Sequence, residues 1–257
     1  MTRFSANLGF LFTELPFLDR FDAAARAGFK AVEFPSPYDH GAEDVARAAR
    51  EAAVEVILIN LPTGDEDKGD VGLTAVPGRE ADYAESLETA LHYAAVLDCP
   101  RLHTMAGIVP DGLRDDDCMA VFADNLAKAC AAAGEQGRDI MIEPINRVDL
   151  PGYVLSYQDQ ARRLIETVRA PNLKLQFDVY HCQIMEGDLA RSFKRLLPLI
   201  GHVQISDNPG RHEPGTGEIN YRYLIPEMAR LGYDGWVGCE YAPKGKTEDG
   251  LGWIEAF

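Results

Sequence analysis

The chain has 257 residues, of which 46% are hydrophobic, so it can build the core of one large domain. Its 41 acidic residues outnumber 25 basic ones and give a formal net charge of −16. Nucleic acids and anionic membranes attract basic surfaces, so this charge argues against either partner.

The first 20 residues include Glu14 and Asp19 and lack a long apolar run, so we expect no signal peptide. No later apolar run has the length of a membrane span. The five cysteines form no C-x-x-C pair, and such an odd, unpatterned set is typical of reduced thiols. The sequence therefore predicts a cytoplasmic protein.

Eight short apolar runs recur along the chain, and each has the length of a buried strand. They cover residues 3–8, 30–34, 54–60, 101–107, 139–144, 173–178, 202–206 and 235–240. The segments between them are helix-like, for example 16–29, 78–98, 116–137, 157–170 and 220–233. This strict alternation predicts parallel strands that are joined by helical crossovers.

Eight such units in about 250 residues match the size of a (β/α)8 barrel. We therefore expect an α/β fold, a TIM barrel formed by residues 1–257 as a single domain. A doubly wound open sheet is the alternative. It usually has fewer strands at this length, and no G-x-G-x-x-G motif follows the first apolar run.

Active sites of such barrels lie at the carboxyl ends of the strands. Glu143 is informative because it ends the apolar run in RDIMIEPIN, directly before Pro144, which cannot donate to a sheet. The other polar residues at or near strand ends are Asn60, Asp178, Gln204 and Glu240. Three carboxylates and an amide from four consecutive strands would thus face one mouth of the barrel.

Carboxylates that crowd into a partly buried site cannot all stay ionised without compensation. Either they share protons or a cation lies among them. Oxygen ligands of this kind suit Mg²⁺ or Mn²⁺, whereas zinc would normally bring more His or Cys. The candidate ligands are Glu143, Asp178, Gln204 and Glu240, and the sequence indicates no organic cofactor.

Several longer segments carry a resemblance to a known family. They are RFSANLGFLFTE at 3–14, VEFPSPYD at 32–39, PGRE at 77–80, IEPINRVDLPGY at 142–153, QFDVYHCQIMEGDL at 176–189, HVQISDNPGRHEPGTGEINY at 202–221 and GWVGCEY at 235–241. With them the chain resembles the hydroxypyruvate isomerases, within the xylose isomerase-like TIM-barrel superfamily. The segments run from end to end, so the resemblance covers essentially the whole chain.

The resemblance implies an isomerase that interconverts hydroxypyruvate and tartronate semialdehyde. It implies that Glu143 and Glu240 are the proton-transfer pair. By correspondence with related ketose epimerases, Glu143, Asp178, Gln204 and Glu240 would hold a divalent metal. Those epimerases usually carry His at the position of Gln204, and an amide binds metal less strongly than imidazole. The family tends to form oligomers, so a homo-oligomer is compatible with the resemblance.

The chemistry also needs groups that bind a small anionic keto acid. Arg211 could bind a carboxylate with two parallel hydrogen bonds, and His181 could donate to a substrate oxygen. Asn60 is expected to line the pocket wall. The long connection at 61–80, after the third apolar run, has a length that suggests a lid over the site.

Four other functions stay open at this point. The nearest is the same chemistry on a larger acid, a 2-oxo-tetronate isomerase, since RLHTMAGIVP at 101–110 also looks like that sister group. A ketose 3-epimerase is less favoured because of Gln204. A nuclease of abasic DNA would need basic surface, which the charge opposes. A sugar-acid binding protein without catalysis would not need both Glu143 and Glu240.

Overall fold

Eight parallel strands close into a barrel in the order β1-β2-β3-β4-β5-β6-β7-β8 in a computed structural model, which describes residues 2–257. The strands are β1 (Arg3–Asn7), β2 (Ala31–Phe34), β3 (Glu55–Asn60), β4 (Arg101–His103), β5 (Asp139–Ile142), β6 (Leu173–Asp178), β7 (Ile200–Ile205) and β8 (Trp236–Cys239). All eight coincide with the predicted apolar runs, so the predicted TIM barrel is confirmed.

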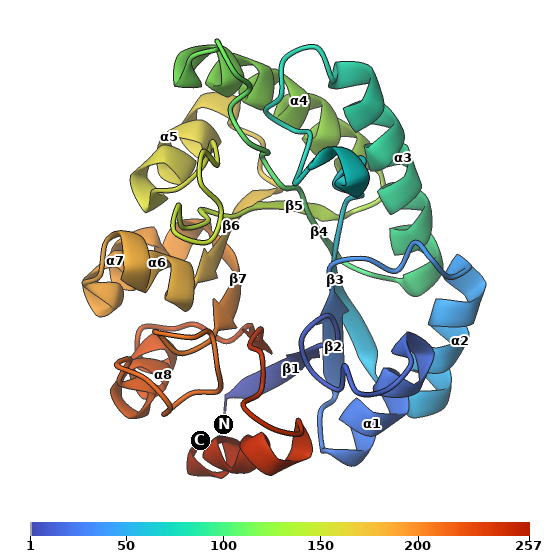
Figure 1. The fold of residues 1–257 in the computed structure, drawn as a ribbon, viewed down its shortest axis with the longest axis vertical. Coiled ribbons are helices and arrows are strands. Elements are labelled where there is room, and N and C mark those ends of the chain that lie inside the picture. Colours follow the sequence, from blue (N-terminus) through green and yellow to red (C-terminus); the bar gives the residue numbers. More distant parts are fainter. Residues whose placement is uncertain (1) are drawn as a thin grey trace.

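Helices surround the strands as an outer ring, which Figure 1 shows from one end of the barrel. The α-helices are α1 (Arg20–Arg26), α2 (Ala42–Ala52), α3 (Glu80–Leu97), α4 (Asp115–Glu135), α5 (Gln158–Val168), α6 (Val179–Met185), α7 (Leu189–Leu196) and α8 (Tyr221–Arg230). Four short 3-10 segments complete the chain at η1 (Phe17–Asp19), η2 (Glu66–Lys68), η3 (Leu197–Leu199) and η4 (Glu248–Ala256). No helix within residues 2–257 combines the length and the apolar character needed to cross a bilayer.

Strand β4 is shorter than the apolar run at 101–107 predicts. Its three residues pair with β3 and β5, and Ala106 instead forms an antiparallel bridge with Gly72. The second half of the predicted strand therefore leaves the barrel and pairs with the long connection between β3 and α3.

That connection is anchored, so it does not have the geometry of the expected lid. Besides the bridge at Gly72, the backbone N–H of Ala75 donates to the carbonyl of Ala106 at 2.8 Å. Arg79 donates two hydrogen bonds, of 3.1 and 3.0 Å, to the carboxylate of Asp70. The connection thus forms part of the wall around the barrel mouth.

The barrel lumen below the mouth holds a buried polar layer. Glu33 is its centre, with no exposed surface, and Ser5 Oγ and His202 Nε2 each lie 2.8 Å from its Oε2. Gln204 Nε2 donates to the other oxygen, Oε1, at 2.8 Å. Burial alone would raise the pKa of Glu33, but His202 and the donated hydrogen bonds outweigh burial and lower this pKa.

Gly238 in β8 makes room for this carboxylate. A Cβ atom at position 238 would lie 2.4 Å from Glu33 Oε1 and 2.6 Å from Oε2, closer than any van der Waals contact allows. The glycine of GWVGCE is therefore required by the close approach of a buried charged group to the strand backbone.

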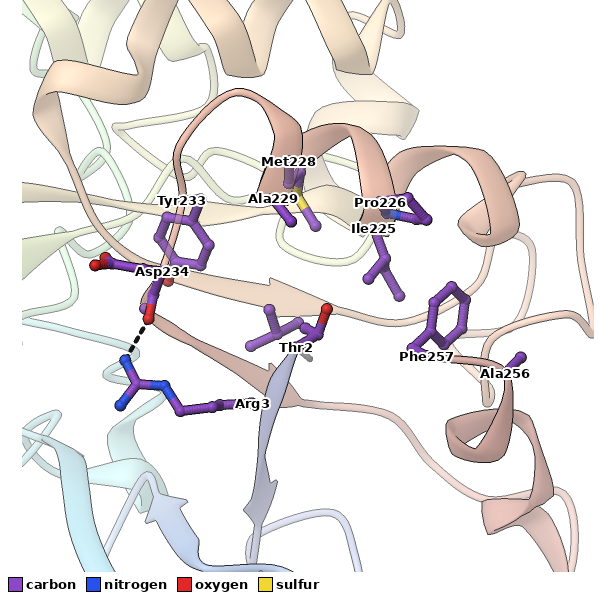
Figure 2. Close-up of a pocket in the computed structure, with 12 residues that line it drawn as sticks. Thr2, Arg3, Ile225, Pro226, Met228, Ala229, Tyr233, Asp234, Ala256 and Phe257 are labelled. Atoms are coloured by element: carbon purple, nitrogen blue, oxygen red, sulfur yellow. Dashed lines mark hydrogen bonds between the residues drawn. The ribbon is translucent and has the colours of Figure 1, made fainter.

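A cavity of about 600 Å³ lies between helix α8, strand β8 and the two chain ends. Figure 2 shows its lining, which includes Thr2, Met228, Tyr233 and Phe257. Arg3 donates to the backbone carbonyl of Asp234 at its edge. Since β1 begins at Arg3, this cavity is at the amino end of the barrel, away from the strand-end carboxylates.

We predict that Gly238→Ala lowers the free energy of unfolding by about 1–3 kcal/mol, because the added methyl group overpacks the strand against Glu33. Urea unfolding followed by circular dichroism measures the effect. Gly245→Ala is the matched control. Nothing lies within 4 Å of a Cβ at that position, so a change below about 0.5 kcal/mol is expected. Equal stabilities of the two variants would contradict the packing argument.

Candidate active site

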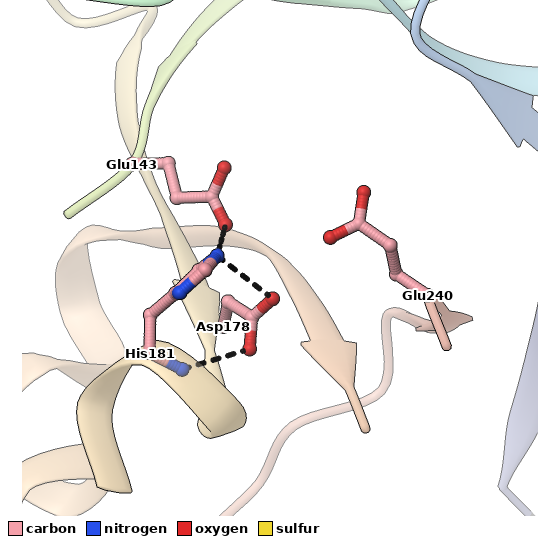
Figure 3. Close-up of side chains that lie close together, drawn as sticks. All are labelled: Glu143, Asp178, His181 and Glu240. Atoms are coloured by element: carbon pink, nitrogen blue, oxygen red, sulfur yellow. Dashed lines mark hydrogen bonds and ion pairs between the residues drawn. The ribbon is translucent and has the colours of Figure 1, made fainter. Parts of the chain in front are cut away.

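Three carboxylates and one imidazole meet at the carboxyl end of the barrel. Glu143 follows β5, Asp178 ends β6, His181 lies in the first turn of α6, and Glu240 follows β8. One ligand atom from each of the four lies within 4.8 Å of the others. In Figure 3 the first three side chains form one group, and Glu240 faces them across a gap. All four residues are among those predicted from the sequence.

Asp178 is held in place by the helix that follows it. It is the N-cap of α6, and its Oδ1 accepts hydrogen bonds from the backbone N–H groups of Tyr180 (2.7 Å) and His181 (3.3 Å). Its Oδ2 has no hydrogen-bond partner although it is buried. One oxygen thus fixes the side chain, and the other is directed into the site.

Glu143 is buried with few donors. Gln176 Nε2 donates to its Oε2 at 3.1 Å, and His103 Nε2 lies 3.6 Å from the same oxygen. Its Oε1 has no partner. Burial, together with the neighbouring carboxylates of Glu240 and Asp178, raises the pKa of Glu143 well above its ordinary value.

Glu240 has a richer set of donors. Arg211 Nη2 donates to its Oε2 at 2.6 Å, and Asn7 Nδ2 donates to its Oε1 at 3.0 Å. Gln204 Nε2 also donates to Oε1, at 3.3 Å. Burial raises the pKa of Glu240 to about 8, while Arg211 acts in the opposite direction. The two glutamates therefore lie in unlike surroundings.

Arg211 is the cation of the site and lies in the loop after β7. Its guanidinium carbon is 4.8 Å from the ring centre of Phe10 and 5.4 Å from that of Tyr180, so two aromatic faces enclose it. Its φ of 55° lies in the left-handed region of backbone conformations, which is uncommon for residues other than glycine. Burial opposes its charge, but the carboxylates led by Glu240 raise the pKa of Arg211.

Gln204 presents its amide nitrogen, rather than its oxygen, to the carboxylates. The nitrogen donates to Glu33 and Glu240, while the oxygen accepts from Gln176 at 2.6 Å. A metal ion would need that oxygen, which accepts a hydrogen bond from Gln176 in this structure. Asn60 lies half-buried at the end of β3. Among the described residues 2–257, the hydrogen bonds that connect the carboxylates do not involve Asn60.

The carboxylate cluster fits a divalent cation. Glu143 Oε1 and Asp178 Oδ2 are both buried and both lack a hydrogen-bond partner. Unpaired buried carboxylate oxygens are costly, and hard oxygen donors of this kind suit Mg²⁺ or Mn²⁺. Glu143, Asp178 and Glu240 are therefore able to hold such an ion, and His181 lies beside them in the same cluster.

Three residues that support the glutamates were not predicted from the sequence. Asn7, Glu33 and Gln176 lie in the lumen and are bonded to Glu240 or Glu143, either directly or through Gln204. Alternation along a strand could have found one of them, because Gln176 is two residues before Asp178 and so shares its face. Asn7 and Glu33 could also have been found, because both are polar and lie at or next to the carboxyl end of a strand.

A cavity of about 750 Å³ opens on the outer side of Arg211. Tyr180, Gln183 and Asn208 are among its lining residues, together with Val148, whose side chain is largely exposed. The mouth of the barrel thus has open space next to the cation of the site.

Comparison with known proteins places the chain in one family. The model of the xylose isomerase-like TIM barrel family matches residues 21–257. A 2-oxo-tetronate isomerase of Cupriavidus necator is 48% identical, with 100% of this chain and 99% of that protein covered. The hydroxypyruvate isomerase of Escherichia coli is 42% identical, with both chains covered completely.

A solved structure from Brucella melitensis, titled as an AP endonuclease of family 2, is 44% identical. Its TM-score is 0.97, and 100% of this chain and 99% of that chain are covered. The family model, the full-length relatives and the closed barrel agree with one another. The chain therefore belongs to the xylose isomerase-like TIM-barrel family and is an isomerase related to hydroxypyruvate and 2-oxo-tetronate isomerases.

Proposed function

We propose that this isomerase interconverts hydroxypyruvate and tartronate semialdehyde by proton transfer through an enediolate. The observation that supports this proposal is the pair Glu143 and Glu240, which face each other across the mouth with unlike hydrogen-bond partners. Two carboxyl groups with different surroundings can serve as acid and base in one reaction.

The reaction moves a carbonyl group by one carbon. A base removes a proton from C3 of hydroxypyruvate, and the electron pair of that C–H bond forms the C2–C3 double bond of an enediolate. A proton then returns to C2, and the hydrogen on the C3 oxygen moves to the C2 oxygen, so that C3 becomes an aldehyde and C2 carries a hydroxyl group. Atoms and electrons balance without an oxidant or reductant, which fits a site built from carboxylates and amides.

Glu240 is proposed as the base and Glu143 as the acid for the direction from hydroxypyruvate. Hydrogen bonds from Arg211, Asn7 and Gln204 stabilise the ionised form of Glu240 and partly offset burial, which raises its pKa to about 8. Glu143 has one donor at hydrogen-bond distance and a raised pKa, so its protonated form is favoured. The roles exchange in the reverse direction.

Arg211 is proposed to bind the substrate carboxylate. Without substrate, its guanidinium pairs with Glu240, and Asp178 Oδ2 lies 4.0 Å away. A planar guanidinium suits a carboxylate, and the rings of Phe10 and Tyr180 keep it at the mouth. In a protein of net charge −16, this cation gives an anionic substrate a local attraction.

A divalent ion, Mg²⁺ or Mn²⁺, is proposed as the cofactor. Glu143, Asp178 and Glu240 would hold it, in line with the unpaired oxygens of the first two. When bound, it would polarise the substrate oxygens and stabilise negative charge that develops on them.

A 2-oxo-tetronate is the second candidate substrate. It has the same keto acid unit and one further hydroxylated carbon, so the proton-transfer chemistry would be unchanged. A relative at 48% identity is named for this activity. The two substrates are to be distinguished by rate.

We predict that Glu143→Gln and Glu240→Gln each lower kcat by about 10²–10⁴-fold, because each removes an acid–base group. The assay follows hydroxypyruvate and a 2-oxo-tetronate in D₂O by NMR, and isomerisation must incorporate deuterium at the new C–H bond. The faster acid identifies the substrate. Wild-type protein that exchanges neither acid, with or without Mg²⁺, would refute the proposed function.

We predict that Arg211→Lys raises KM by about 10- to 100-fold, because an ammonium group cannot form the paired hydrogen bonds of a guanidinium. Steady-state kinetics on the faster acid measures it. Arg191→Lys, on the exposed face of α7, is the control and should leave KM unchanged. An Arg211→Lys variant with a normal KM would show that the carboxylate is bound elsewhere.

We predict that removal of divalent ions with a chelator lowers kcat about tenfold or more and that Mg²⁺ restores it. Titration with Mn²⁺, followed by electron paramagnetic resonance, measures binding separately from activity. Asp178→Asn should weaken that binding, since it removes one of the three carboxylates. Full activity of the chelated protein would contradict a cofactor role for the ion.

A further inference from the structure

The side-chain amide of Asn146, in the loop after β5, has only one orientation that satisfies its neighbours. Its Oδ1 accepts hydrogen bonds from the backbone N–H groups of Val148 (3.0 Å) and Asp149 (2.8 Å). Its Nδ2 donates to the carboxylate of Asp149 at 2.9 Å. A flipped amide would place its nitrogen against two donors and its oxygen against a carboxylate, so the positions of oxygen and nitrogen are fixed.

This fixed amide determines which nitrogen of His181 carries a proton. The second N–H of Asn146 Nδ2 is directed at His181 Nδ1, 2.7 Å away, and the backbone N–H of Asn146 lies 3.4 Å from the same atom. Two donors can share Nδ1 only if it has a free lone pair. The imidazole is therefore neutral, with its proton on Nε2.

The Nε2–H group lies in the catalytic site. It is 3.9 Å from Glu143 Oε1 and 3.8 Å from Asp178 Oδ2, the two buried oxygens without partners. These separations are too long for hydrogen bonds, so the donor has no acceptor of its own and an oxygen of the substrate can take that place.

We propose that Asn146 is a positioning residue that holds His181 as its Nε2–H tautomer and so provides a hydrogen-bond donor for the substrate oxygen that becomes negatively charged. The role in turnover rests on the proposed function. A neutral donor of this kind stabilises an enediolate without a further proton transfer. It also means that His181 has no lone pair to offer a metal, which leaves the three carboxylates as the ligands.

The first test reads the tautomer directly. Protein with ¹⁵N-labelled histidine has six imidazoles, and ¹⁵N NMR distinguishes a protonated from an unprotonated ring nitrogen. His181→Gln assigns the signal. We expect Nδ1 without a proton in the wild type, in metal-free buffer and with Mg²⁺. In Asn146→Asp the carboxylate accepts from the ring, so the proton should move to Nδ1.

The second test measures the consequence for catalysis. Asn146→Asp should lower kcat by about 10²–10³-fold, with a much smaller change in KM, because it removes a donor that acts on developing charge. Asn125→Asp is the matched control, since Asn125 is also buried and donates to the carbonyl of Thr74 at 2.9 Å. Correctly folded Asn125→Asp should keep the His181 tautomer and a kcat within about threefold of the wild type.

A new carboxylate at 146 would lie next to Asp149 and could prevent folding. The double variant Asn146→Asp with Asp149→Asn keeps one donor and one acceptor between these positions, and it should reverse the His181 tautomer in a folded protein. An Nδ1–H tautomer in the wild type, or a variant with reversed tautomer and unchanged kcat, would overturn the inference. If the tautomers are as expected but neither acid is turned over, the result supports the control of the His181 tautomer by Asn146. It refutes only the proposed function.

Discussion

Four carboxylates share the lumen near the carboxyl end of the barrel, and their oxygens all need partners. Glu33 obtains them from Ser5 and His202, whereas Asp178 obtains them for only one of its oxygens, from the N-terminus of α6. Isolated carboxylates would be unstable in such a dry interior. Most other features of the mouth follow from this demand, including the buried amides, the neutral imidazole and the enclosed guanidinium.

The hydrogen-bond donors are distributed unequally between Glu143 and Glu240. Amides connect Glu33 to Glu240 through Gln204 and Asn7, and they connect Glu143 to the same network through Gln176. Arg211 adds a full charge on one side only. Two identical side chains thereby have different hydrogen-bond partners within one small volume, and the proposed acid and base roles rest on this difference.

The sequence predicted the barrel and the main side chains of the site because both depend on short-range patterns. Apolar runs fix the strands, and a polar residue at the end of such a run must lie at the mouth. The orientation of the Gln204 amide was not predictable, since it depends on Glu33 from β2 and Gln176 from β6. The role of Asn146 was also hidden, because only the folded loop brings it to His181.

The anchored connection between β3 and α3 was missed for a related reason. Its length suggested a lid, and length alone says nothing of the backbone bonds that Gly72 and Ala75 form with the neighbouring loop.

The three bonds of Gln204 also have a consequence for substitutions at this position. A glutamine supplies two N–H donors and one acceptor, and all three are used, by Glu33, Glu240 and Gln176. A neutral histidine at this position offers one donor and one acceptor, so one of these three hydrogen bonds would be lost. Residue 204 is therefore energetically coupled to residues 33, 176 and 240. The effect of exchanging glutamine for histidine here is expected to depend on the identity of these three residues.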